Sequence, residues 1–284
     1  MISTYEKFSN KLNTKIRDGV DFYKEIISTI IKNPYRYAGL FRLSNAKTKL
    51  LQNITQSREI KFGDFMEDIV TDYLGLRGFH NLPKWLGTNI DGDDLSADQM
   101  SEKDGTLFFV EQKIRDDHDS TKKRGQFENF EKKIKHIKSL YPQYNLKAYM
   151  WFIDNSLKKN KNYYLQKINE VSSIYSDVEI GCVYGDDLFN DVFNDKQLWE
   201  EIKIYLAQWK SQHTNNIEIP DLDTDDTVFE AMKLLSSSEL QKLTSNENIF
   251  VLIRQELFPN LINFKKLKQY FIENNDIRKN YIHI

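Results

Sequence analysis

Hydrophobic positions over residues 5–80 recur every three to four residues, which predicts helices. Isoleucine pairs over residues 26–31 form the apolar face of one helix, which Pro34 ends. Two more helices are expected at residues 46–56 and 62–74. The N-terminal part of the chain is therefore predicted to be helical.

The pattern changes after residue 80 to short stretches of strand-like residues. These stretches are residues 95–102, 106–113, 147–153 and 179–184. Between the second and third stretches, one helix places apolar side chains at intervals of three and four: Phe127, Phe130, Ile134 and Ile137. The order predicts the α/β class, with a mixed central sheet of about four to five strands flanked by helices.

The C-terminal part has a different pattern. Residues 211–227 are polar and acidic and contain Pro220, so we expect a linker or long loop there. Residues 228–284 have a helical pattern without a strand. We predict a first domain at residues 1–210, including the N-terminal helices, and a helical subdomain at residues 228–284.

The composition is that of a soluble globular protein, with 40% hydrophobic and 29% charged residues. Forty Lys and Arg against 42 Asp and Glu exclude a wholly basic coat for nucleic acid. Cys182 is the single cysteine, which excludes a disulfide framework and a cysteine-clustered metal site. The sequence shows neither a signal peptide nor an apolar run of membrane-spanning length, so we expect a cytoplasmic protein.

A hairpin is predicted around Asp104-Gly105, because both central positions of a two-residue turn need positive φ. The expected register pairs Lys103 with Thr106, Met100 with Phe109, and Asp98 with Glu111. Lys113 follows Glu111 by two residues and returns to the same face. We therefore predict that Asp98, Glu111 and Lys113 lie together on one face.

Two carboxylates on neighbouring strands repel each other unless a cation lies between them. Oxygen ligands from two carboxylates, completed by water and phosphate, suit Mg²⁺, and an adjacent lysine can orient a water molecule. Together these groups suit hydrolysis of a phosphodiester. Asp91, Asp94 and Asp104 compete with Asp98 as the first acid, but Asp104 fits the turn, and Asp91 and Asp94 lie in a polar loop.

Asp98, followed after twelve intervening residues by Glu111-Gln112-Lys113, resembles the PD-(D/E)xK nuclease signature. The apolar stretch of residues 106–110 before Glu-x-Lys is typical of it, although Ala97 replaces the proline of the signature. The continuation over residues 114–126 resembles type II restriction endonucleases of that superfamily. The resemblance covers roughly residues 62–184.

This resemblance implies Mg²⁺-dependent cleavage of both strands of a specific DNA site, leaving 5′-phosphate and 3′-hydroxyl ends. Asp98 and Glu111 would hold the metal, with the backbone carbonyl of Gln112 as a further ligand. Lys113 would position the attacking water, and Glu67, on the helix before the hairpin, would support the metal site. A homodimer and a cognate DNA methyltransferase as genetic partner are implied as well.

A basic concentration follows the hairpin, with seven basic and two acidic residues between residues 120 and 138. The basic residues are Lys122, Lys123, Arg124, Lys132, Lys133, Lys135 and Lys138. Such a run is often a solvated helix face, but here it adjoins the candidate site and could track phosphates. Gln126 resembles a glutamine that many such nucleases carry at this point, and it joins Lys122, Lys123 and Arg124 as a candidate DNA contact.

Two alternatives remain open. One is a repair or recombination nuclease of the same fold that acts on branched or single-stranded DNA. The other is a non-catalytic DNA-binding protein, in which the hairpin acids form a solvated edge. Base recognition or dimerisation would suit residues 228–284, and the sequence does not separate these two roles.

Overall fold

The computed structural model describes residues 4–16, 19–213 and 221–282, and the chain divides into two compact units. The first unit consists of residues 1–12 and 62–212, and the second of residues 13–61 and 213–284. Helix α3 (Ala46–Leu76) contributes to both units. The two helices expected within this range are one continuous helix, which corrects the prediction. No glycine or proline interrupts the residues between them, so nothing local breaks the helix.

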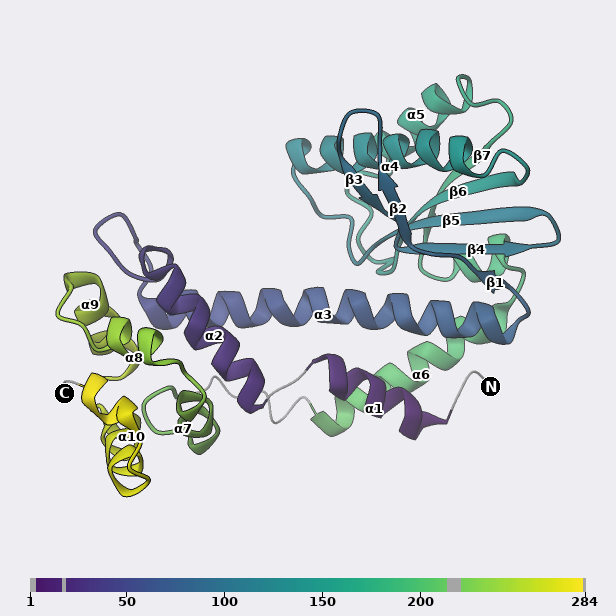
Figure 1. Cartoon of the computed structure of the whole chain (residues 1–284). Coiled ribbons are helices and arrows are strands. Elements are labelled where there is room, and N and C mark those ends of the chain that lie inside the picture. The colour runs from purple at the N-terminus through teal and green to yellow at the C-terminus, as the bar shows by residue number, and fades with distance from the viewer. Residues whose placement is uncertain (1–3, 17–18, 214–220, 283–284) are drawn as a thin grey trace. The chain divides into compact units, whose positions relative to one another are not determined.

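A five-stranded mixed sheet in the order β1-β4-β5-β6-β7 forms the centre of the first unit (Figure 1). Its strands are β1 (His80–Asn81), β4 (Gln99–Lys103), β5 (Thr106–Lys113), β6 (Asn145–Phe152) and β7 (Glu179–Tyr184). β4 runs antiparallel to β1 and β5, whereas β5, β6 and β7 are parallel. The predicted α/β class with a mixed central sheet is confirmed.

The β4–β5 hairpin has the predicted register, with Lys103 opposite Thr106. Asp104 and Gly105 have φ values of 52° and 75°, as the expected two-residue turn requires. The last β4 pair is Gln99 with Val110, so Asp98 lies just before the strand. Asp98, Glu111 and Lys113 therefore lie at the open end of the hairpin, away from its turn.

The prediction of one strand over residues 95–102 is wrong in its first part. β3 (Asp94–Ser96) pairs instead with β2 (Trp85–Thr88) in a separate two-stranded sheet. The amide of Ala97 donates to the carbonyl of Lys84, 2.8 Å away, and the chain turns at Asp98 before β4 begins. Pairing with Lys84 and β2, which are distant in sequence, thus separates β3 from β4. The alternation of apolar and polar residues does not reveal such pairing.

Helices cover both faces of the five-stranded sheet. α4 (Ser120–Leu140) crosses one face, where Phe130 stacks on Phe109 of β5 with 5.5 Å between ring centroids (Figure 1). On the other face, Trp151 of β6 contacts Phe189 of η2 (Leu188–Val192) and Trp199 of α6 (Lys196–His213). The remaining helices of this unit are α1 (Tyr5–Lys15) and α5 (Lys161–Ser172).

All the regular secondary structure in the described part of the second unit is helical. With the first half of α3 it contains α2 (Val20–Lys32), η1 (Pro34–Arg36), α7 (Asp226–Lys233), α8 (Ser237–Leu243), α9 (Asn248–Leu257), α10 (Ile262–Glu273) and η4 (Ile277–Tyr281). Ile27, Ile30 and Ile31 lie in its core, as their spacing predicted. Seven of the seventeen residues of the expected linker, 214–220, lie outside the described residues, whereas residues 211–213 belong to α6 and residues 226–227 begin α7.

None of the described helices combines the length and the apolar composition that crossing a bilayer requires.

Candidate active site

Glu111 is a buried carboxylate near the end of β5. Strand alternation places it on the face of Phe109, toward α4, and only 2% of the residue is exposed. The ammonium of Lys113 lies 2.8 Å from Oε1, and that of Lys133 lies 2.6 Å from Oε2. Both carboxylate oxygens therefore have a cationic partner, as a buried charge requires.

Lys113 brings three oxygen atoms together. Its Nζ lies 2.8 Å from Glu111 Oε1, 2.8 Å from the carbonyl oxygen of Gln112, and 3.5 Å from Asp98 Oδ2. Burial acts to lower the pKa of Lys113, but the charges of Glu111 and Asp98 outweigh it and the pKa is raised. The side chain is therefore a protonated ammonium at neutral pH.

Asp98 reaches the same group of atoms from the turn before β4. Its Oδ2 accepts a hydrogen bond from the backbone amide of Gln112, 2.7 Å away. Burial raises the pKa of Asp98, and the charge of Glu111 raises it further, while Lys113 and Lys133 act against this. A nearby positive charge therefore stabilises the ionised form of Asp98.

The competing acids lie in other surroundings. Asp91 and Asp94 are exposed, and Asp94 accepts from the hydroxyl of Thr88 at 2.7 Å. Asp104 occupies the hairpin turn with positive φ. Of these four acids, Asp98 is the one bonded to the Glu111-Gln112-Lys113 segment.

Glu67 borders this cluster from α3. Its carboxylate pairs with Lys84 at 3.1 Å, and its backbone carbonyl accepts from the side chain of Gln99 at 2.7 Å. Burial raises the pKa of Glu67, and the nearby charge of Asp98 raises it further. Glu67 therefore interacts electrostatically with Asp98, and its ion pair with Lys84 holds it in place.

Lys133 is a member of the cluster that the sequence analysis did not identify. It was grouped with the basic residues expected to track phosphates, but only 6% of it is exposed and it bonds Glu111. This corrects the interpretation of that one residue. A signal was present, because Lys133 lies between Phe130 and Ile134 on the apolar stripe of α4.

The candidate DNA contacts lie at the start of α4, whose first amides are capped by Asp119. Lys122 and Arg124 are exposed, and the ammonium of Lys123 lies 4.6 Å from the ring centroid of Tyr163. Gln126 accepts from the hydroxyl of Tyr164 at 3.0 Å. In the described part of the chain, these four residues share no hydrogen bond or ion pair with Glu111 or Lys113.

The donor set suits a hard divalent cation. Two carboxylates and the Gln112 carbonyl are oxygen ligands of the kind that Mg²⁺ prefers, and three of their oxygens converge on one ammonium. Among the described residues, no group of three or more His, Cys, Asp or Glu side chains could hold a metal ion. The candidate side-chain ligands are two, Asp98 and Glu111, and the ligands beyond these and the Gln112 carbonyl would come from water and substrate.

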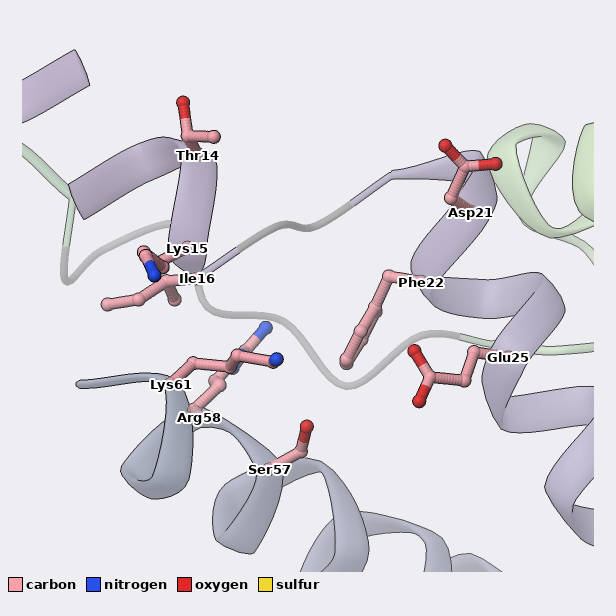
Figure 2. Close-up of a pocket in the computed structure, with 9 residues that line it drawn as sticks. All are labelled: Thr14, Lys15, Ile16, Asp21, Phe22, Glu25, Ser57, Arg58 and Lys61. Carbon is pink, nitrogen blue, oxygen red and sulfur yellow. The ribbon is translucent and has the colours of Figure 1, made fainter. Parts of the chain in front are cut away.

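A separate hollow of about 380 Å³ lies in the second unit. Figure 2 shows Arg58 and Lys61 of α3 on one side of it, with Phe22 and Glu25 of α2 across from them. None of the expected site residues lines this hollow. Asp98 and Glu111 are bonded to Lys113 at the end of β5 instead.

The mixed sheet, with an acid and a Glu-x-Lys pair meeting at the end of the β4–β5 hairpin, agrees with the resemblance of the sequence to PD-(D/E)xK nucleases. The family model described as type II restriction endonuclease, HinfI, matches residues 4–85 and 86–210. The chain belongs to this family of type II restriction endonucleases, which are hydrolases that cleave DNA. No curated protein and no solved structure matches the chain.

Proposed function

We propose that this protein cleaves both strands of duplex DNA at a specific sequence, with Mg²⁺, through Asp98, Glu111 and Lys113. Family membership supports DNA cleavage, and type II restriction endonucleases are typically metal-dependent. The observation that carries the assignment of residues is the Lys113 ammonium, which lies among the oxygens of Glu111, Gln112 and Asp98.

In this proposal Asp98, Glu111 and the Gln112 carbonyl hold the metal. Bound Mg²⁺ would supply positive charge at the scissile phosphate and lower the pKa of a water molecule. Lys113 orients the attacking water and stabilises the negative charge that develops on the phosphate. Glu67, beside Asp98, supports the metal site from α3.

Lys133 acts as a positioning residue. It bonds Glu111 Oε2 while Lys113 bonds Oε1, so the carboxylate is fixed between α4 and its own strand. A carboxylate with both oxygens bonded has little freedom to rotate. Lys133 therefore sets the orientation of Glu111 before substrate binds.

Attack by water in line with the leaving 3′-oxygen would leave 5′-phosphate and 3′-hydroxyl ends. Cleavage of both strands at a symmetric site suits a homodimer in which each subunit reads one half-site. Lys122, Lys123, Arg124 and Gln126 at the start of α4 would contact DNA near the cut. A cognate DNA methyltransferase would protect the host site.

We also propose a role for each part of the chain. Within the predicted first domain of residues 1–210, residues 1–12 and 62–210 would form the nuclease unit. Residues 228–284 would read bases or form the dimer contact. In the structure, the helices of residues 13–61 belong to the same compact unit as α7 to α10, so they would share that second role.

The test is a digest of plasmid and bacteriophage DNA by the purified protein, with Mg²⁺ or with EDTA. We expect discrete fragments that require Mg²⁺, and sequencing of their ends gives the recognition site and the cut position. Cleavage restricted to flaps, junctions or single strands would favour a repair nuclease instead. Binding without cleavage under any metal would contradict the proposal.

A further inference from the structure

The loop of residues 39–45, between η1 and α3, exposes three large apolar side chains to solvent. Leu40 is 91% exposed, Phe41 is 93% exposed and Leu43 is fully exposed at 108%. Single exposed apolar residues are ordinary, but three within four positions form a contiguous apolar tip. We name residues 39–45 the apolar loop.

The apolar loop is anchored at both ends. Before it, Tyr37 is 1% exposed and its hydroxyl accepts from Asn53 at 2.6 Å. After it, the buried Ala46 begins α3, with Asn45 accepting from the amide of Thr48 at 2.8 Å. The apolar tip is therefore presented by a loop with fixed ends.

A further contact shapes the tip itself. The amide of Arg42 donates to the carbonyl of Gly39 at 3.0 Å, and its guanidinium donates to the carbonyl of Tyr35 at 2.9 Å. Gly39 has a φ of 129°, a conformation that L side chains rarely adopt. The bond from Arg42 to Gly39 closes a turn in which Leu40 and Phe41 are the two central residues, at the tip of the loop.

Positive charge surrounds the apolar loop. Residues 26–58 contain six basic residues and no Asp or Glu: Lys32, Arg36, Arg42, Lys47, Lys49 and Arg58. Arg36, Arg42 and Lys47 are exposed beside the tip. One acid, Glu256 of α9, accepts from the amide of Ala46 at the end of the loop. The segment is thus strongly basic in a chain whose net charge is −2.

We propose that the apolar loop is a contact surface for duplex DNA. Leu40, Phe41 and Leu43 would lie in a groove against base edges or between base steps, as apolar side chains of DNA-bending proteins do. Arg36 and Lys47 would contact the phosphates on either side. The inference rests on the DNA substrate that the family establishes, and it assigns a part of the chain that the proposed catalytic residues do not include.

Charge complementarity selects DNA over a second copy of this chain. An interface that brings two such loops together would juxtapose two basic segments, and like charges at an interface oppose association. The same segment against a phosphate backbone releases counterions and gains affinity. An apolar tip flanked by basic residues therefore fits DNA better than it fits itself.

The test measures binding of the full-length protein to a short fluorescein-labelled duplex in EDTA, by anisotropy over a range of salt concentrations. Phe41→Ala should weaken binding about five-fold or more without changing the salt dependence, because it removes an apolar contact with bases. Arg36→Ala with Lys47→Ala should lower the slope of log affinity against log salt by about two. Ile90→Ala, which truncates a side chain that is 95% exposed elsewhere, is the matched control.

Wild-type affinity and salt slope in both loop variants would overturn the inference while leaving the nuclease proposal intact. Unchanged DNA binding, with Phe41→Ala converting a dimer into a monomer by analytical ultracentrifugation, would assign the loop to a subunit interface instead. Unchanged DNA binding with lost binding to anionic lipid vesicles would assign it to a membrane surface. A wild-type protein that binds no DNA would remove this inference and the proposed function together.

Discussion

Lys133 of α4 and Glu111 of β5 form a buried ion pair, with 2.6 Å between Nζ and Oε2 and side chains that are 7% and 3% exposed. The pair joins the helix that crosses the sheet to the strand that carries the candidate chemistry. Removal of one partner from a buried pair leaves an uncompensated charge, which costs more than loss of an exposed pair.

Lys133→Met should therefore lower the free energy of unfolding by about 3 kcal/mol, near the low end for a buried pair because Lys113 still compensates Glu111. Urea denaturation measures this. The neighbouring Lys132→Met should cost less than about 1 kcal/mol, because Lys132 and its partner Asp93 are half-exposed.

A double-mutant cycle separates the pair from simple loss of packing. In the Glu111→Gln background, Lys133→Met should cost clearly less than it does in the wild type, because the unpaired charge is gone. Equal costs in both backgrounds would mean that the ion pair contributes nothing to the stability of this site.

Lys113→Ala should reduce the rate of DNA cleavage by about 100-fold or more, which is typical for loss of one group that stabilises developing charge. DNA binding in EDTA should change little, because the side chain faces Glu111 and Asp98 at the end of the hairpin. Single-turnover cleavage and anisotropy measure the two effects. Lys103→Ala, on the same hairpin with its ammonium over the Phe79 ring, is the control and should cut normally.

Asp98→Asn should stabilise the metal-free protein at neutral pH. Burial and the charge of Glu111 raise the pKa of Asp98 in the folded protein. The stability that such a group contributes is present below its ordinary pKa and is lost as the pH rises through the raised pKa. Asparagine keeps an oxygen for the Gln112 amide but carries no charge.

Urea unfolding in EDTA across a range of pH checks this prediction. The gain of Asp98→Asn over the wild type should be present at neutral pH and shrink as the pH falls through the pKa of Asp98. Asp94→Asn, at an exposed carboxylate bonded to Thr88, should show no comparable gain. A variant at Asp98 that is less stable than the wild type at neutral pH would show that the carboxylate charge is favourable in the folded apo protein.

Local rules predicted the hairpin well. Asp104-Gly105 specifies a turn by its φ preferences alone, and the turn then fixes the β4–β5 register by counting. Asp98 could for this reason be placed beside the Glu111-Gln112-Lys113 segment from sequence. Family resemblance supplied the chemistry, of which the family comparison supports DNA cleavage.

Features that depend on distant partners were missed. The break between β3 and β4 depends on the carbonyl of Lys84, and the burial of Lys133 depends on how α4 crosses β5. The association of residues 13–61 with the C-terminal helices joins apolar stripes far apart in sequence, such as Ile30 and Val228 in one core. The sequence shows each apolar stripe, but it does not show which distant stripe packs against it.

The most direct measurement compares Mg²⁺-dependent plasmid cleavage by the wild type, Glu111→Gln and Glu128→Gln, with circular dichroism to confirm that each is folded. Glu128 is an exposed acid on α4 and serves as the matched control. We predict the same discrete fragments from the wild type and Glu128→Gln, and intact plasmid from Glu111→Gln. Cleavage by folded Glu111→Gln at the wild-type rate would contradict the assignment of catalysis to the end of the β4–β5 hairpin.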